Sequence, residues 1–386
     1  MKNADTAHRP TNCELRIADY ELSASEVAGA EKRRRSRTAR IRNSQFAIRN
    51  LLWLVALVAA VSILGTPVLQ AENGWRRIEG PPAIELPRDH GAHPDVQTEW
   101  WYLTGNLRSA DGRRAFGFQI TLFRIALQPR PVSSDSAWRT NQVWMAHAAL
   151  SDVSAGDHQA YERFAREALG LAGAQRAPLR VWLEDWQLQL DEPGGLWRLQ
   201  LPTPGFDLTL ALTPASPVVL QGDRGLSQKS AEPGNASYYY SIPRLQASGQ
   251  LRLNGETLVV QGTAWLDREW STSALGPEQT GWDWFSLQLD DGRELMLYRL
   301  RREDGTTDPY NSGTLVGTDG STRRLSHGDV RYEPGRRWKS PRSGASYPVE
   351  WLLLIEPFDL ELTVFPMLEA SELDAVVRYW EGAIRV

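Results

Sequence analysis

The chain has 386 residues and a formal net charge of −4, and its first 50 residues are basic whereas the remainder is acidic. An acidic body argues against a nucleic-acid partner, because contacts with phosphate require a basic surface. The single cysteine, Cys13, excludes an internal disulfide framework, an iron–sulfur cluster and a cysteine-type zinc site.

Residues 51–64 form an uncharged apolar run that follows Arg42 and Arg49 and precedes a small-residue stretch ending at Ala71. This order is typical of a secretory signal peptide. The run is shorter than the roughly 20 residues of a membrane span. We therefore predict a signal peptide at residues 51–71 and an exported, periplasmic or otherwise extracytoplasmic protein. A membrane anchor formed by an uncleaved signal is the alternative.

Residues 1–50 precede this signal, although the basic region of a signal peptide is normally short. The same three residues also recur at positions 41–43 and 48–50. We interpret residues 1–50 as a disordered basic leader or as a mis-called, translated upstream repeat. They are excluded from the predicted fold.

From about residue 95 onward the pattern is that of β-strands. Residues 101–107 and 115–124 are β-rich runs on either side of Asp111-Gly112, which is a hairpin signal. Similar runs follow at residues 181–190, 197–201, 206–212, 249–253, 284–289 and 295–300. Short strands separated by glycine turns indicate an antiparallel sandwich or barrel. We predict an all-β protein with little helix, the candidate helices being residues 157–171 and 369–377.

A loop rich in Gly, Ser, Pro and charged residues spans positions 222–237, and hairpins followed by a Trp-rich acidic motif occur on both sides of it. We therefore place a domain boundary near residue 235. The predicted domains are residues 85–235 and residues 236–386.

Two clusters combine carboxylates with bulky aromatic rings, one at residues 90–102 and the other at residues 265–270 with 282–285. Burial beside an indole raises the pKa of a carboxyl group and allows it to act as a general acid near neutral pH. In a strand, Asp267 and Glu269 point to one face, whereas Arg268 and Trp270 point to the other. The alternative is a network of arginines and carboxylates that braces one end of a barrel.

His90, His93 and His147, with Glu99, are the candidate metal ligands, but two of these histidines lie in a Gly/Pro loop that does not define a site. We predict no metal and no cofactor. His147 lies in an apolar run, either as a core histidine or as the lining of a cavity. The sequence also lacks the motifs of zinc proteases, α/β-hydrolases, nucleotide-binding loops and dinucleotide-binding folds. A barrel lined by aromatic residues, suited to a hydrophobic small molecule or lipid, remains.

Residues 89–105, 117–124, 238–241, 266–271 and 284–299 resemble, in order, the motifs of the AttH family, which is related to the carotenoid 1,2-hydratases. The resemblance runs from about residue 85 to the end of the chain. It implies two lipocalin-like antiparallel β-barrel domains and an apolar ligand, an isoprenoid or a lipid. It also implies a further strand after residues 379–386, so we expect an open edge in the second barrel.

Carotenoid hydratases add water to a terminal isoprenoid double bond without a cofactor. The resemblance therefore implies that Asp267 is the acid, with Glu269 and Tyr298 as the other catalytic candidates. Trp270, Trp282 and Trp284 would face the carbocation. The remaining candidates for ligand contact are His93, Glu99, Trp100, Trp101, Tyr102, Gln119, Arg124, His147 and Arg268.

The sequence departs from the hydratases at Arg268, where they have a histidine, and around Tyr298, where they have a nearby aspartate. A guanidinium cannot transfer a proton. AttH-like proteins are associated with ABC-type permeases, so the resemblance also implies a lipid-handling role. Three hypotheses follow: an exported binder of an apolar ligand, a hydratase or hydrolase that uses Asp267 or Glu269, and a structural subunit of a transporter complex. Neutralisation of both carboxylates by Arg268 and Arg299 would make acid catalysis implausible.

Overall fold

The computed structural model describes residues 14–20, 74–129, 136–191, 195–273, 275–276 and 278–386. The predicted signal peptide and most of the predicted leader lie outside the described residues. Almost all regular structure in the described residues is β-strand, and three short 3-10 helices occur at Arg88–His90, His327–Asp329 and Glu356–Phe358. None of the helices found in these ranges is long and apolar enough to span a membrane.

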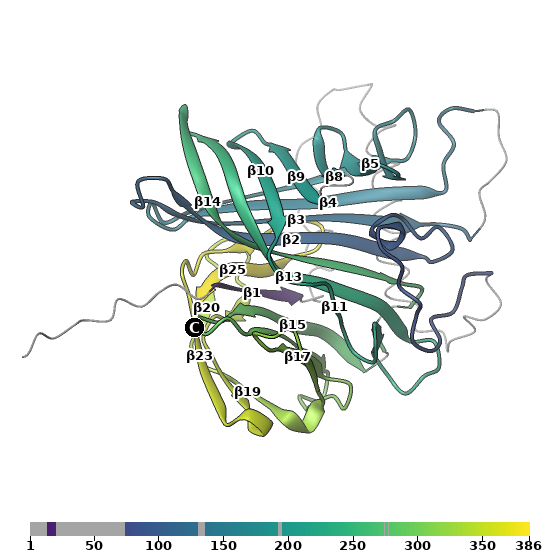
Figure 1. Cartoon of the computed structure of the whole chain (residues 1–386), viewed down its shortest axis with the longest axis vertical. Coiled ribbons are helices and arrows are strands. Elements are labelled where there is room, and N and C mark those ends of the chain that lie inside the picture. Colours follow the sequence, from purple (N-terminus) through teal and green to yellow (C-terminus); the bar gives the residue numbers. More distant parts are fainter. Residues whose placement is uncertain (1–13, 21–73, 130–135, 192–194, 274, 277) are drawn as a thin grey trace, which may run out of the picture.

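The larger sheet curls into a nearly closed barrel (Figure 1). Its strands in spatial order are β5 (Asp157–Arg166), β4 (Gln142–Asp152), β3 (Ala115–Ala126), β2 (Thr98–Ser109), β14 (Glu256–Ser271), β13 (Ala236–Leu253), β10 (Phe206–Pro214), β9 (Leu196–Pro202), β8 (Trp186–Asp191), β7 (Leu179–Leu183) and β6 (Ala172–Arg176). The short strands β11 (Val219–Leu220) and β12 (Leu226–Gln228) pair with β13.

The smaller sheet forms a half-barrel packed against the first. Its strands in spatial order are β18 (Thr322–Leu325), β17 (Ser312–Val316), β16 (Glu294–Arg302), β15 (Gln279–Gln288), β1 (Glu14–Tyr20), β25 (Tyr379–Arg385), β23 (Leu360–Pro366), β22 (Trp351–Ile355) and β19 (Val330–Pro334). Strand β24 (Glu372–Leu373) pairs with β25, and β20 (Arg337–Lys339) pairs with β21 (Ser346–Pro348). The predicted all-β, lipocalin-like architecture is confirmed.

Two segments expected to be helical are extended instead. Most of the first, residues 157–171, forms β5, which pairs with β4 along its whole length. Its apolar residues Phe164, Leu169 and Leu171 are exposed, so their spacing does not mark a buried helix face. In the second, residues 369–377, the regular structure is β24, held by β25. Pairing with a neighbouring strand overrides local helix propensity in both places.

The division of the chain between the two sheets differs from the domain boundary that we predicted near residue 235. Residues 236–271, expected in the second domain, form β13 and β14 and pair within the first sheet. The second sheet begins after Ser271, at β15. In addition, residues 14–20, which we excluded from the fold, form β1 between β15 and β25. The edge expected to be open is therefore paired in this structure.

The second half of β14 is buried on both faces, which positions the candidate site. Among residues 256–263 only Val260 is buried, whereas residues 264–271 are all buried. The inner face of this half lines the core of the first barrel, and the outer face packs against the second sheet. A separate apolar core fills the half-barrel. Between the sheets lies a third cluster: Tyr102, Tyr239, Trp265, Trp284, Met296, Tyr298 and Leu300.

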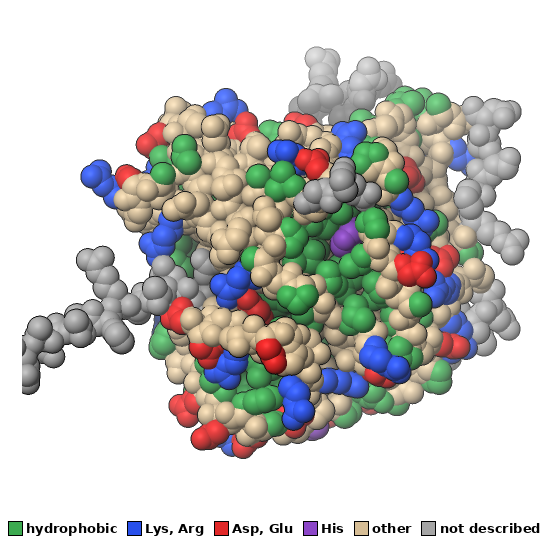
Figure 2. Space-filling view, viewed as in Figure 1, with side chains coloured by type: hydrophobic (Ala, Val, Ile, Leu, Met, Phe, Trp, Pro, Cys, Tyr) green, Lys and Arg blue, Asp and Glu red, His purple; other side chains and the backbone are tan. Residues whose placement is uncertain are grey.

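Apolar and charged side chains occupy different parts of the molecular surface. In Figure 2, hydrophobic side chains gather in the centre of the face shown, whereas charged side chains are spread around its periphery. The predicted hairpin around Asp111-Gly112 occurs as the β2–β3 pair, and β13 and β14 form a second hairpin across Asn254-Gly255.

Candidate functional site

Strand β14 carries two different sets of side chains on its two faces. Asp267 and Glu269 face the second sheet, where they join the aromatic cluster between the sheets. Arg268 and Trp270 point into the first barrel, where Arg268 lies 3.8 Å from the centre of the Trp101 ring. The side-chain period of two that we used for this strand therefore describes its geometry correctly.

The Asp267 carboxyl is buried and surrounded by neutral hydrogen-bond donors. Its Oδ1 accepts hydrogen bonds from the Ser241 hydroxyl at 2.5 Å and from the Trp265 indole at 2.7 Å. Its Oδ2 accepts one from the Tyr239 hydroxyl at 2.9 Å. Burial raises the pKa of Asp267 to about 7, although these three donors act in the opposite direction. The nearby charge of Glu269 adds to the rise. A carboxyl group with this pKa can give up and regain a proton near neutral pH.

The hydrogen bonds determine which oxygen of Asp267 carries that proton. An indole N–H only donates, so the Trp265 contact keeps Oδ1 an acceptor. The Ser241 hydroxyl accepts from the Gln221 amide at 2.8 Å and therefore donates its own hydrogen to Oδ1. Oδ2 is left to carry the acid proton, and when Asp267 is protonated its O–H donates to the Tyr239 oxygen, which reverses the hydrogen bond that Tyr239 gives to the carboxylate. Burial and the charge of Asp267 raise the pKa of Tyr239 well above its usual value, so Tyr239 stays neutral and can pass a proton on.

Glu269 forms a separate ion pair beside Asp267. It accepts a hydrogen bond from Ser237 and lies 3.2 Å from the Lys229 ammonium. Burial disfavours the charge on Lys229, but its interactions with Glu269, Tyr298 and Asp267 together outweigh burial and raise the pKa of the lysine. Lys229 also lies 4.4 Å from the centre of the Tyr298 ring and donates to Ser227, which is hydrogen-bonded to the Tyr298 hydroxyl at 3.1 Å. The three predicted catalytic residues are thus in one cluster.

Aromatic rings from both sheets surround this cluster. Trp284 of β15 meets Tyr102 of β2 edge-on at 5.3 Å and Trp265 of β14 at 6.4 Å. Its indole also donates to the Tyr239 hydroxyl at 3.2 Å. Trp100 and Trp282 pack against the same group from partly buried positions. Of the predicted ligand-contacting rings, Trp100, Tyr102, Trp282 and Trp284 therefore lie at the site.

The arginines are engaged elsewhere. Arg268 and Arg124 both form ion pairs with Glu99, and all three side chains are fully or almost fully buried. Although burial opposes ionisation, Arg268, His93 and Arg124 hold the pKa of Glu99 far below its usual value. Arg299 pairs instead with Asp283. Asp267 and Glu269 are therefore not neutralised by Arg268 and Arg299.

The group around Glu99 forms a brace at the end of the first barrel. Arg268 donates to the carbonyl oxygen of Gly91, and Arg124 donates to those of His93 and Val96, which holds the segment before β2 against the barrel. The remaining residues expected to contact a ligand lie away from Asp267. His93, Glu99, Trp101, Arg124, Arg268 and Trp270 contact one another in the brace, and His147 bonds Tyr379 and Glu162 beside β25. Gln119 lies on β3 beside Thr121.

Residues 77–386 match the sequence pattern of AttH-like proteins. The chain belongs to the AttH-like family. It is similar to the crystal structure of a protein described as an AttH from Nitrosomonas europaea, with 39% sequence identity and a TM-score of 0.71 over 79% of this chain and 93% of that one. Kievitone hydratase from Nectria haematococca has a related fold, with 14% identity and a TM-score of 0.58 over 81% and 95%. No functionally curated protein matches the sequence.

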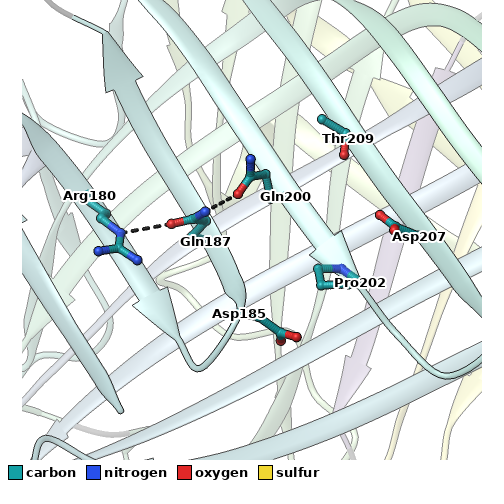
Figure 3. A pocket seen from close by; sticks show the side chains of 7 residues that line it. All are labelled: Arg180, Asp185, Gln187, Gln200, Pro202, Asp207 and Thr209. Carbon is teal, nitrogen blue, oxygen red and sulfur yellow. Dashed lines mark hydrogen bonds between the residues drawn. The ribbon is translucent and has the colours of Figure 1, made fainter. Parts of the chain in front are cut away.

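Two of the pockets among the described residues of this AttH-like chain differ in their position relative to the site. The larger, of about 400 Å³, lies over β7–β10 and is lined by polar side chains such as Arg180, Gln187 and Gln200, which are hydrogen-bonded to one another (Figure 3). It contains none of the candidate residues. The smaller, of about 250 Å³, is lined partly by Ser227 and Tyr298 and therefore reaches the cluster around Lys229.

Several residues of the site were not predicted. Lys229 lies in the loop that we interpreted as a domain boundary, and a single lysine in a Gly/Ser-rich segment carries no distinguishing signal. Ser241 and Tyr239 belong to a motif that we noted, but only their pairing with β14 shows that they face Asp267. Within the residues that the structure describes, no group of three or more His, Cys, Asp or Glu side chains is placed to hold a metal ion.

Proposed function

We propose that this protein is a cofactor-independent acid–base enzyme of the hydratase type that acts on an apolar, unsaturated small molecule. The observation that carries the proposal is the Asp267 carboxyl, which has a pKa of about 7 and lies among aromatic rings without an arginine partner. A protonated carboxylic acid near neutral pH is what protonation of a double bond requires.

In the proposed reaction Asp267 gives the proton on Oδ2 to one carbon of the double bond, directly or through the Tyr239 hydroxyl. The electron pair of the double bond forms the new C–H bond, and the positive charge develops on the neighbouring carbon. The ring faces of Trp284 and Tyr102 stabilise that charge. Water then adds to the cation and returns a proton to the Asp267 carboxylate, which completes the cycle without a cofactor.

The comparison with kievitone hydratase is consistent with this proposal, since that protein is named as a hydratase and shares the fold. We further propose, from the apolar run at residues 51–64, that the protein is exported, and from the family that it works beside an ABC-type permease. These proposals do not depend on one another.

A second candidate function is binding of an apolar isoprenoid or lipid without turnover. The closed packing of the cluster favours it, because Asp267 is only 4% exposed and Trp284 only 8%. A substrate must therefore displace side chains to reach the acid, whereas a carrier needs only the outer aromatic surface. The third hypothesis, a structural subunit of a transporter complex, draws support from the Glu99 brace alone.

One experiment distinguishes the hydratase from the carrier. Protein purified without detergent is incubated with isoprenoid and phenolic alkenes in oxygen-labelled water, and products are examined by mass spectrometry. We expect incorporation of one labelled water by the wild type and none by Asp267→Asn. The control is Asp290→Asn, which changes an exposed aspartate in the turn after β15. Retention of alkenes without incorporation of water would support the carrier and refute the enzyme.

A further inference from the structure

The pocket of about 250 Å³ beside Tyr298 has the chemistry of an anion-binding site. Its lining residues include Tyr298, Asn311 and Arg324. Ser312 and Ser326 line it too, but their hydroxyls donate to the Leu325 carbonyl and to Asp329. No aspartate or glutamate side chain lines it. A guanidinium and an amide NH₂ group can together donate to the oxygen atoms of a carboxylate.

Two of the lining residues have a hydrogen-bond donor available, and one of them, Asn311, is held in place. The amide oxygen of Asn311 accepts the Leu300 backbone N–H at 2.8 Å, which orients its NH₂ group as a donor. That nitrogen is buried and, within the described residues, has no hydrogen-bond partner. Arg324 is exposed and forms no ion pair with any carboxylate of the described part of the chain. An unpaired buried donor gains from a ligand that brings an acceptor.

The pocket shares residues with the proposed catalytic cluster. Tyr298 lines it, and its hydroxyl is hydrogen-bonded to Ser227, which in turn accepts from Lys229. Tyr310 lines the pocket as well and, together with Trp282, packs in a partly buried position against the aromatic cluster. A molecule whose polar end lies in the pocket can therefore place its apolar part on these rings.

We propose that this pocket binds the carboxylate of an apolar acid, with its unsaturated chain directed toward Asp267. This inference rests on the proposed function and specifies its substrate class. A volume of about 250 Å³ is below the roughly 300–1,000 Å³ of pockets that enclose a whole ligand. The pocket therefore holds the polar end of the substrate, and the aromatic cluster holds the remainder.

The test compares two ligands with one carbon skeleton, geranic acid and geraniol, by isothermal titration of the full chain at a pH where the acid is ionised. We expect the acid to bind about tenfold more tightly than the alcohol, the gain of a charge-assisted hydrogen bond. Arg324→Gln should abolish this preference. The matched control is Arg323→Gln, the preceding exposed arginine on β18, which does not line the pocket and should retain the preference.

Failure of this proposal is distinguishable from failure of the proposed function. Equal affinity for acid and alcohol, equal effects of the two arginine substitutions, or no binding of either ligand would overturn the carboxylate site. Asp267→Asn should still prefer the acid, because Asp267 does not line the pocket. Preferential binding of the acid without hydration would support the carboxylate site and refute the hydratase. Hydration of both ligands, bound with equal affinity, would support the hydratase and refute the carboxylate site.

Discussion

Replacing Asp267 by asparagine should change how the stability of the protein depends on pH. Asparagine has nearly the same shape, and its NH₂ group can donate to the Tyr239 oxygen as the protonated Oδ2 would. Burial raises the pKa of Asp267 from 3.8 to about 7 in the folded protein. Below about pH 4 the carboxyl is therefore protonated in both the folded and the unfolded chain, and its titration does not affect stability.

Between about pH 4 and about pH 7 the unfolded chain releases this proton while the folded protein keeps it, so the free energy of unfolding of the wild type falls. The pKa difference of about 3, at about 1.4 kcal/mol per unit, corresponds to about 4 kcal/mol by pH 8. Asp267→Asn does not titrate and should not show this loss. The variant is thus expected to become more stable than the wild type as the pH rises.

Urea unfolding followed by tryptophan fluorescence at several values between about pH 4 and about pH 8 measures the difference. Asp290→Asn serves as the exposed control and should follow the wild type throughout. If the difference between Asp267→Asn and the wild type is the same at every pH, Asp267 has an ordinary pKa. The assignment of this carboxyl as the acid would then be wrong.

Three further predictions concern the same strand and its neighbours. Hydration by the wild type should decline above about pH 7, as Asp267 loses its proton; a rate that keeps rising with pH would contradict this. Tyr239→Phe should lower kcat by roughly 10- to 100-fold with little change in KM if the phenol relays the proton; an unchanged kcat would mean direct transfer from Asp267. Arg268→Met should lower the free energy of unfolding by about 3 kcal/mol or more, because it removes a cation from buried Glu99. Recovery in the double variant with Glu99→Gln would support this explanation, and a loss below about 1 kcal/mol would refute the brace.

Most of the fold is predictable from local sequence pattern. Alternating runs on either side of Asp111-Gly112 and Asn254-Gly255 are hairpins in the structure, because both the turn residues and the strand period are short-range signals. The expectations that differ from the structure concern segments whose conformation depends on contacts with residues far away in the sequence. Residues 157–166 are a strand because β4 offers them a partner, and β13 belongs to the first sheet because it pairs with β10 and β14.

The candidate site was predictable in part for the same reason. Alternation along one strand separates Asp267 from Arg268, which is a local property. Which partner each side chain meets is not local. Arg268 pairs with Glu99, 169 residues earlier, and Tyr298 meets Ser227, 71 residues earlier. Without these contacts the sequence leaves open whether the arginines neutralise Asp267 and Glu269, which is the question that separates an acid catalyst from a structural brace.

The alternation of β14 has a consequence for how this part of the gene can change. Inserting or deleting one codon just before the codon for Asp267 would turn every later side chain of the strand to the opposite face. The acid would then enter the core of the first barrel, and Arg268 would face the aromatic cluster, so both arrangements would be lost together. Single substitutions here damage one arrangement at a time. Among homologous genes, we therefore expect the length of this stretch to vary less than its composition.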